Sequence, residues 1–344
     1  MRHMDYSRLQ IGVLGAGSFG TVLANLVAEN GFSCSLWMRD EVAAVKATTN
    51  RVNDRYLPDY KLAAGLNISS DLAAVASADL LIMTVPSHAF RELAKKIAPL
   101  VKHEVMIVSG TNGMEPATSD LMSQVLLEEI PSCRIGVLSG PNLAQEISRR
   151  QITGSVIASR DSEICQATQE ILNCPYFRVY TNDDLVGVEL AGALKNIYAI
   201  LSGIAAGAGY GANSLSMLIT RGLAEMSRYA AHFGANPASY LGLSGVGDLL
   251  ATCTSPLSRN YQIGLRIGKG MSLDEAIADL SQTAEGVNTV RVISKSAREI
   301  GVDMPLATAL YQILFEGRTM SAVIRELMDR DSKQDVEYKV TCNG

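Results

Sequence analysis

The first half of the 344-residue chain repeats one pattern, in which a short apolar run is followed by a turn and then by a segment of helical periodicity. The predicted strands are Ile11–Leu14, Ser33–Met38, Leu80–Val85, Val105–Val108, Ile135–Leu138, Ser155–Ala158 and Phe177–Tyr180. The predicted helices lie near Phe19–Asn30, Asp40–Asn50, Ser87–Ala98, Pro116–Glu129, Asn142–Arg149 and Ser162–Leu172. Strands that are apolar throughout are typical of a parallel sheet covered on both faces. The pattern therefore predicts a doubly wound α/β domain.

The second half has a different pattern. From Leu185 to about Asp329 the periodicity is helical, with hardly a convincing strand. Ser272 and Glu275 have the spacing of a helix N-cap and its capping-box partner, and Gly301 and Pro305 separate two later helices. We therefore predict an α/β domain over residues 1–184, an all-α domain over 185–331 and a polar tail over 332–344.

A glycine-rich turn, Gly15-Ala-Gly-Ser-Phe-Gly20, lies directly after the first predicted strand and opens the first helix. In this context GxGxxG has a physical meaning: Gly15 permits a tight turn, Gly17 lets the backbone approach a pyrophosphate, and Gly20 lets helix and strand pack closely. The helix N-terminus then presents N–H groups to the phosphates. We predict a Rossmann-like dinucleotide-binding domain.

The end of the second predicted strand bears on the choice of cofactor. Sites specific for NAD usually place a carboxylate there, which binds the ribose 2′-hydroxyl. Here Met38 stands at that point and Arg39 follows, and an arginine can contact a 2′-phosphate or stack on adenine. A shift of one residue would make Asp40 the ribose ligand instead. The sequence favours NADP and leaves NAD open.

Charge and composition restrict the partners. The formal net charge of -5 does not provide the basic surface that a general nucleic-acid binder needs. The four histidines and six cysteines show no metal-ligand spacing, so we expect no metal and reduced, mostly packing cysteines. The apolar span Leu185–Ala208 carries Glu189, Lys195 and Asn196, which favours a helix buried in protein over a membrane span. With no resemblance to a signal peptide at the N-terminus, we expect a cytoplasmic protein without stable membrane insertion.

One lysine, Lys195, lies in an otherwise apolar helical segment. Its neighbours three and four residues away are small or amphipathic, which leaves room for a ligand. An ammonium in such surroundings needs a partner or its pKa falls, and a lysine placed in this way serves as an acid or base near neutrality. The alternative is structural, with the lysine extending from a half-exposed helix into solvent.

Two later segments add polar groups. Asp248 is an isolated carboxylate after a pair of glycines, and Ser258, Arg259 and Asn260 follow in succession. Arginine suits phosphate because its planar donors bind two oxygens at once. Each residue has an ordinary alternative, since Asp248 can cap a helix and Arg259 can form a surface ion pair. Together with Lys195 they indicate a phosphorylated secondary alcohol as substrate.

These segments together resemble the NAD(P)-dependent glycerol-3-phosphate dehydrogenases, particularly the bacterial type. They occur in the family's order between about residue 11 and about residue 315. The matching segments are Gly15–Gly20, Val85–Ser87, Gly140–Glu146, Glu189–Asn196, Gly247–Cys253, Ser258–Asn260 and Ala284–Val287. The Lys195-Asn196 and Arg259-Asn260 segments are far more specific than the glycine loop.

The resemblance implies a role for each matching position. Lys195 would accept the proton when the secondary alcohol is oxidised and donate it in reverse, with Asn196 and Asp248 as the catalytic residues that orient it and the reacting oxygen. The implied substrate contacts are Asn112, Gly140, Asn142, Lys195, Asp248, Ser258, Arg259 and Asn260. The implied cofactor contacts are Gly15, Gly17, Ser18, Phe19, Gly20, Arg39, Asn112, Ala144, Arg259, Thr283 and Glu285.

Two positions depart from the family pattern. Asn112 stands where the family usually has a lysine that touches cofactor and substrate, and Asn142 stands where serine or threonine is more usual. An asparagine donates hydrogen bonds but does not neutralise a phosphate. We therefore hypothesise weaker substrate binding rather than a different reaction.

The resemblance implies interconversion of sn-glycerol 3-phosphate and dihydroxyacetone phosphate with NADP or NAD, a supply of glycerol 3-phosphate for phospholipid synthesis, and a homodimer. Two alternatives stay open. One is another two-domain dehydrogenase of the hydroxyacid or phosphogluconate type, which shares the glycine loop and a helical second domain. The other is a catalytically inactive, redox-sensing dinucleotide binder.

Overall fold

The computed structural model of the chain describes residues 6–280, 285–331 and 334–335. The chain divides into two compact units, Met1–Leu185 and Val186–Gly344, and each is described by itself. Most of the predicted polar tail, and Thr283 among the predicted cofactor contacts, lie outside the described residues.

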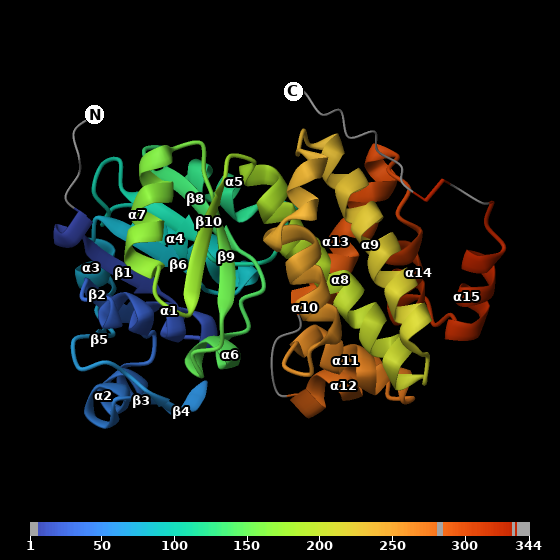
Figure 1. The fold of residues 1–344 in the computed structure, drawn as a ribbon, viewed down its shortest axis with the longest axis horizontal. Coiled ribbons are helices and arrows are strands. Elements are labelled where there is room, and N and C mark those ends of the chain that lie inside the picture. The colour runs from blue at the N-terminus through green and yellow to red at the C-terminus, as the bar shows by residue number, and fades with distance from the viewer. Residues whose placement is uncertain (1–5, 281–284, 332–333, 336–344) are drawn as a thin grey trace. The chain divides into compact units, whose positions relative to one another are not determined.

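The first unit is built on an eight-stranded sheet with the spatial order β10-β9-β8-β7-β6-β1-β2-β5 (Figure 1). The strands are β1 (Gln10–Leu14), β2 (Ser33–Trp37), β5 (Asn67–Ser69), β6 (Leu80–Met83), β7 (Met106–Ser109), β8 (Arg134–Ser139), β9 (Thr153–Ala158) and β10 (Phe177–Asn182). All seven predicted strands are present, with ends within two residues of those predicted. The order reverses at β1, as in a doubly wound sheet.

The sheet is parallel except at one pair. β8 and β9 are antiparallel, so β9 and β10 run opposite to the other six strands. β10 is an edge strand with alternating buried and exposed residues, whereas β6 and β7 are buried throughout. The parallel part of the sheet that contains β1 therefore comprises β5, β2, β1, β6, β7 and β8.

Helices cover the sheet on both faces. They are α1 (Ser18–Glu29), α2 (Glu41–Asn50), α3 (Leu72–Ala76), α4 (Ser87–Ile97), α5 (Met122–Glu129), α6 (Ala144–Ser148) and α7 (Ser162–Leu172). The prediction of a helix from Pro116 was wrong at its start, because residues up to Leu121 form a turn closed by a bridge between Met114 and Leu121. The sequence patterns also missed α3, β5 and the short hairpin β3 (Val52–Asn53) and β4 (Leu57–Lys61).

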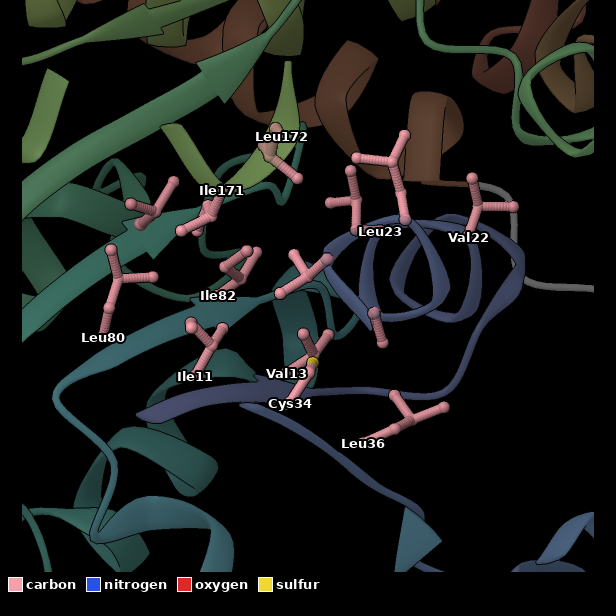
Figure 2. Close-up of a cluster of buried hydrophobic side chains, with 14 of the residues drawn as sticks. Ile11, Val13, Val22, Leu23, Cys34, Leu36, Leu80, Ile82, Ile171 and Leu172 are labelled. Atoms are coloured by element: carbon pink, nitrogen blue, oxygen red, sulfur yellow. The ribbon is translucent and has the colours of Figure 1, made fainter. Parts of the chain in front are cut away.

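Successive residues of the central strands pack into two separate cores. Ile11 and Val13 of β1 and Ile82 of β6 face α1 and α7 (Figure 2), where Leu23 and Ile171 meet them. Leu14 belongs to the opposite core, with side chains of α3, α4 and α5. This period of two is what a sheet buried on both faces requires, and it confirms the expected fold class.

The second unit is helical, with no strand among its described residues. Its helices are α8 (Leu185–Gly207), α9 (Ala212–His232), η2 (Pro237–Leu241), η3 (Leu243–Gly247), α10 (Asp248–Thr254), α11 (Arg259–Gly268), α12 (Leu273–Leu280), α13 (Glu285–Ile300), α14 (Pro305–Phe315) and α15 (Met320–Met328). The predicted capping box is present, since Ser272 N–H donates to Glu275 Oε2 (2.8 Å) and Glu275 N–H donates to Ser272 Oγ (3.3 Å).

Helices α8 and α11 touch through their backbones. A Cβ on Gly203 would lie 2.1 Å from the Tyr261 carbonyl oxygen, and one on Gly264 would lie 2.0 Å from the Ile200 oxygen. Gly207 and Gly268 repeat this contact one turn further on. Only glycine allows so close an approach. The relative position of the Lys195 and Arg259 segments is thereby fixed by backbone contact.

Helix α8 is the one described helix whose length and apolar composition would suit a membrane span. However, 18 of its residues are buried. In its apolar 18-residue window, 89% of the residues are buried inside the protein. The prediction of a helix buried in protein is confirmed.

One buried carboxylate joins three helices of this unit. Glu225 of α9 accepts hydrogen bonds from Tyr198 Oη (3.1 Å) and from the first-turn amides of Leu306 (2.7 Å) and Ala307 (3.2 Å) of α14. Despite these donors, burial raises the pKa of Glu225 from its ordinary 4.5 to about 7.

This shift predicts how stability depends on pH. Between pH 4.5 and 7 the unfolded chain has released the Glu225 proton while the folded protein retains it, so stability falls as pH rises through this window. The loss is on the order of 3 kcal/mol. Urea unfolding at pH 5 and 8 should show it in the wild type, and Glu225→Gln should remove that part of the slope. An unchanged slope in the variant would contradict the assignment.

Candidate functional site

The glycine loop joins β1 to α1 in the first unit. Gly15 has φ +117°, and a Cβ on Gly20 would lie 1.9 Å from the Gly15 carbonyl oxygen, so both positions require glycine. A Cβ on Gly17 would meet nothing within 4 Å. Packing within the protein therefore explains Gly15 and Gly20, whereas the space beside Gly17 remains for a ligand.

The N-terminus of α1 is suited to an anion. Its N-cap is Gly17, with no side-chain cap and no acidic residue in the first turn. The amides of this turn thus donate to no capping side chain and carry the partial positive charge of the helix. The glycine loop and the first turn of α1 therefore fit the diphosphate of a dinucleotide.

Two side chains that the sequence patterns missed hold the glycine loop through hydrogen bonds to its carbonyl groups. Thr84 Oγ donates to the Gly15 carbonyl (2.9 Å), and Asn53 Nδ2 donates to the Ala16 carbonyl (2.9 Å). Asn53 is buried and lies in the hairpin β3–β4, which has no strong sequence pattern. Among the predicted contacts, Ser18 Oγ donates to the Tyr56 carbonyl (3.3 Å).

At the end of β2 the two candidate ribose ligands, Arg39 and Asp40, have different surroundings. Asp40 is the N-cap of α2, and its Oδ1 accepts from the Ala43 amide at 3.0 Å. Arg39 is exposed and Met38 is buried. Beside Met38 lies a cavity of about 170 Å³ that is lined in part by Lys46 and Arg55.

Polar residues follow β7 and β8 at the same edge of the sheet. Asn112 Oδ1 accepts from Ser139 Oγ at 3.5 Å, and Asn142 Nδ2 donates to Ser155 Oγ at 3.1 Å. The Ser155 hydroxyl donates in turn to the Ser139 carbonyl (3.0 Å). Asn142 Oδ1 is buried and has no hydrogen-bond partner among the described residues, so it is an acceptor available to a ligand donor.

The remaining predicted residues of the first unit lie close to these groups. A Cβ on Gly110 would contact the Phe19 ring at 3.3 Å, which puts the glycine loop next to the segment that carries Asn112. Gly140 has φ +134°, and Ala144 is the first residue of α6, two residues after Asn142. The first unit thus gathers its predicted residues at the carboxyl ends of β1, β2, β7 and β8, where open α/β sheets bind ligands.

In the second unit Lys195 and Asp248 form a buried ion pair. Lys195 Nζ donates to Asp248 Oδ2, and the two residues are 7% and 2% exposed. The Thr252 hydroxyl donates to Asp248 Oδ1 (3.2 Å) from the next turn of α10. The alternative of a lysine that extends into solvent is therefore wrong. Thr252 was not among the predicted site residues, although its i+4 spacing from Asp248 is a recognisable signal.

A chain of amides lies next to this pair. Asn260 Nδ2 donates to Asn196 Oδ1 (2.9 Å), and the Gly286 amide donates to Asn260 Oδ1 (3.2 Å). A Cβ on Gly286 would lie 2.5 Å from Asn260 Oδ1, so this glycine is needed for the contact. Glu285, the residue before it, begins α13. The structure brings Asn196, Asn260 and Glu285 together from α8, α11 and α13.

The N-terminus of α11 presents the predicted phosphate ligands. Ser258 is its buried N-cap and accepts from the Tyr261 amide at 3.3 Å. Arg259, the first helical residue, is exposed and forms no hydrogen bond or ion pair with any described residue. Its guanidinium is therefore available to an anion.

The described residues contain no group of three or more side chains suited to hold a metal ion. They contain the buried free cysteines Cys34, Cys133, Cys165 and Cys253. Burial raises the pKa of the Cys253 thiol to about 12. The groups available for chemistry are thus a buried ammonium with its carboxylate, amides and an exposed guanidinium.

Comparison with known proteins covers nearly the whole chain. The two profiles of the NAD-dependent glycerol-3-phosphate dehydrogenases match residues 10–165 for the N-terminal part and 184–325 for the C-terminal part. A glycerol-3-phosphate dehydrogenase [NAD(P)+] from Azotobacter vinelandii is 53% identical over 96% of this chain and 98% of its own. One from Teredinibacter turnerae is 51% identical over 96% and 98%.

A solved structure agrees with these sequences. The glycerol-3-phosphate dehydrogenase from Coxiella burnetii has a TM-score of 0.90 and 36% identity, covering 94% of this chain and 99% of that one. The likeness thus extends over both units and over sequence as well as fold. The chain belongs to the NAD-dependent glycerol-3-phosphate dehydrogenase family.

Proposed function

We propose that the protein interconverts sn-glycerol 3-phosphate and dihydroxyacetone phosphate with NADP or NAD. The observation that carries this proposal is the buried Lys195–Asp248 pair next to the Asn196–Asn260 amides. A buried ammonium whose carboxylate partner holds it in place is suited to give or take one proton in a dry site.

Reduction of the ketone requires one hydride and one proton. NADPH or NADH, when bound, supplies the hydride to the middle carbon of the triose. Lys195 Nζ polarises the ketone oxygen and transfers its proton to that oxygen as the alcohol forms. Asp248 fixes the direction of the ammonium, and Thr252 fixes Asp248. In oxidation Lys195 takes the hydroxyl proton back.

The substrate phosphate would bind at the N-terminus of α11. Arg259 offers two coplanar N–H donors to two phosphate oxygens, and Ser258 and Asn260 flank it. Because the phosphate is remote from the reacting carbon, its binding energy serves to align that carbon. The free acceptor Asn142 Oδ1, Gly140 and Asn112 would provide the contacts of the first unit.

The cofactor would bind with its diphosphate at the glycine loop, beside Ser18, Phe19 and Ala144. Asp40 already caps α2, which supports Arg39 as the residue that meets the adenosine ribose and therefore a preference for NADP. We assign residues 1–184 to the cofactor and 185–331 to catalysis, with Thr283 and Glu285 as further cofactor contacts. A homodimer, a cytoplasmic location and a supply of glycerol 3-phosphate for phospholipids are proposed from the family resemblance.

The test is a titration of NADPH and of NADH with dihydroxyacetone phosphate, with oxidation followed optically. We expect turnover with both and a lower KM for NADPH. A panel containing 6-phosphogluconate and short 2-hydroxyacids should give no reaction in the oxidative direction. Turnover on one of those in place of glycerol 3-phosphate would favour the other dehydrogenase, and no turnover at all would favour the inactive binder.

The Asn112 departure gives a separate prediction. Asn112→Lys restores the cation that the family pattern has at this position and that the resemblance places in contact with cofactor and substrate, so KM for dihydroxyacetone phosphate should fall about tenfold, the value of one charge-assisted hydrogen bond. The control is Asn112→Met, because methionine is similar in length to lysine but carries no charge. This variant loses the asparagine amide as well, so its KM should be higher than that of the wild type. Steady-state kinetics decides, and a KM that does not fall in Asn112→Lys would show that another group already fills this role.

A further inference from the structure

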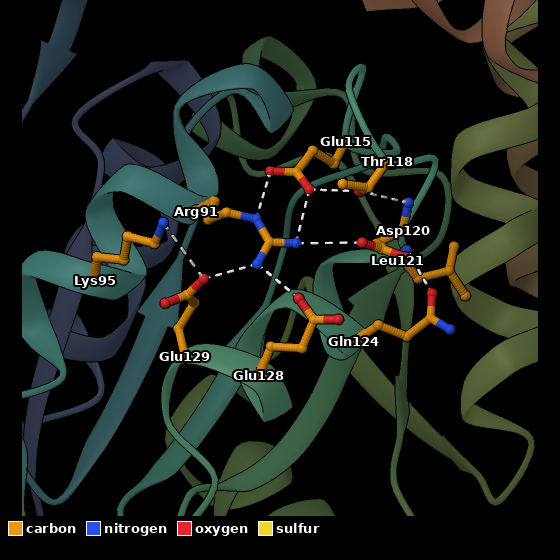
Figure 3. Close-up of polar contacts among 9 residues, drawn as sticks. All are labelled: Arg91, Lys95, Glu115, Thr118, Asp120, Leu121, Gln124, Glu128 and Glu129. Carbon is orange, nitrogen blue, oxygen red and sulfur yellow. Dashed lines mark hydrogen bonds and ion pairs between the residues drawn. The ribbon is translucent and has the colours of Figure 1, made fainter.

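A single arginine outside the proposed site joins three segments of the first unit. Arg91 of α4 pairs with Glu115 through Nε and Nη2 (both 2.7 Å), with Glu128 (2.6 Å) and Glu129 (2.7 Å) of α5, and with Asp120 (3.2 Å). Figure 3 shows the guanidinium at the centre of these four carboxylates. Glu115 is largely buried, and Arg91 holds the pKa of its carboxyl below its usual value. This cluster differs from an ordinary surface ion pair, because one guanidinium binds four carboxylates and contacts Glu115 through two nitrogens.

The segment that Arg91 holds is a closed and strained turn. The Glu115 amide donates to the Asp120 carbonyl and the Ser119 amide to the Glu115 carbonyl, both at 2.9 Å. Ser119 has φ +69°, a left-handed conformation that persists in a non-glycine residue only when its surroundings fix it. Thr118 Oγ donates to Glu115 Oε2 at 2.5 Å. The contacts of Arg91 with Glu115 and Asp120 supply that fixation from outside the turn.

The start of the same segment carries Asn112. Thr111 is buried, with its hydroxyl donating to the Val85 carbonyl at 2.7 Å, so the chain is fixed just before Asn112. After Asn112 the chain is fixed again by the Met114–Leu121 bridge and the Arg91 cluster. The place of the Asn112 backbone therefore depends on both of these fixed points, and the second of them depends on Arg91.

We propose that Arg91 is a positioning residue for the contact that Asn112 makes with cofactor and substrate, an inference that rests on the proposed function. Arg91 neutralises carboxylates from the turn and from α5 that would otherwise repel each other. Without it, Glu115 and Asp120 move away from Glu128 and Glu129, the turn opens, and Asn112 loses its fixed position. Lysine does not replace arginine here, because a point charge does not make the bidentate contact with Glu115 and reach the other carboxylates.

The experiment compares Arg91→Met and Arg91→Lys with Arg134→Met. Arg134 of β8 also pairs with two carboxylates, Asp161 (2.6 Å) and Glu163 (2.6 Å), and both of these lie outside the 111–121 segment. Two readouts are independent of turnover: the exchange rate of the Glu115 and Ser119 amides, and the Kd of NADPH from quenching of Trp37, the single tryptophan. Displacing a binding group by about 1 Å has large effects, so we expect Kd to rise about tenfold in Arg91→Met, less in Arg91→Lys, and not in Arg134→Met.

The route through Asn112 is tested in an Asn112→Ala background, where Arg91→Met should change Kd no further. Unchanged amide exchange and Kd in both Arg91 variants, equal effects of Arg134→Met, or a full effect in the Asn112→Ala background would each overturn the proposal. If Arg91→Met does not fold, Arg91→Lys carries the comparison. Failure of the proposed function is seen separately, as absence of turnover by the wild type with dihydroxyacetone phosphate.

Discussion

Lys195→Met is expected to lower kcat for dihydroxyacetone phosphate reduction by about 10³-fold or more and to leave the Kd of NADPH nearly unchanged. The variant removes the proton donor, which contributes about 10²–10⁴-fold in other enzymes. It also removes the cation that stabilises the developing alkoxide. Stopped-flow turnover and a cofactor titration on the same preparation give the two values, and a kcat near that of the wild type would refute the assignment.

The loss must be separated from damage to the fold. Removing Lys195 leaves Asp248, which is 2% exposed, without its buried cation. Breaking such a pair costs about 3–5 kcal/mol. The double variant Lys195→Met/Asp248→Asn removes both charges, so we expect it to regain most of the stability while staying inactive. Lys295→Met, on the exposed face of α13, is the matched control and should have normal kcat and stability.

Local patterns were sufficient to predict seven of the eight strands of the main sheet and most of the helices. The central strands are apolar throughout because both faces are buried, and this makes them visible in the sequence. The hairpin β3–β4 was missed since its strands are short and half-exposed. The α5 start was placed too early because the turn before it is closed by the Met114–Leu121 bridge and by Arg91 of another helix, and no helical periodicity reports these contacts.

The site residues divide in the same way, into those that a local pattern predicts and those defined by contacts between distant parts of the chain. Gly15, Gly17 and Gly20 were found from spacing, because all three act within one turn of the chain. The Lys195–Asp248 pair joins residues 53 positions apart, and no periodicity relates them. Burial of Lys195 distinguishes a catalytic ammonium from a lysine that extends into solvent, and burial is a property of the assembled helices. The residues alone indicated that both belong to one site, and the family resemblance implied that Asp248 orients Lys195.

Gly17→Ala should raise the Kd of NADPH about 100-fold while leaving thermal stability almost unchanged. In the protein alone a Cβ at this position meets nothing within 4 Å, and φ -69° with ψ 179° is open to alanine. The added methyl therefore acts only on a ligand that approaches the backbone here, as the diphosphate is proposed to do. A 100-fold change corresponds to about 2.7 kcal/mol of binding free energy.

Two other glycines make the comparison decisive. A Cβ on Gly65 would also meet nothing within 4 Å, and this residue is exposed, so Gly65→Ala should change neither Kd nor stability. Gly20→Ala should lose both, since its Cβ would lie 1.9 Å from the Gly15 oxygen and 2.3 Å from Thr84 Oγ. Tryptophan quenching by NADPH and thermal unfolding measure the two quantities. The methyl group of Gly17→Ala contacts no other protein atom, so it can weaken NADPH binding only by meeting the cofactor itself. If this variant binds NADPH as tightly as the wild type, the diphosphate does not lie against this turn.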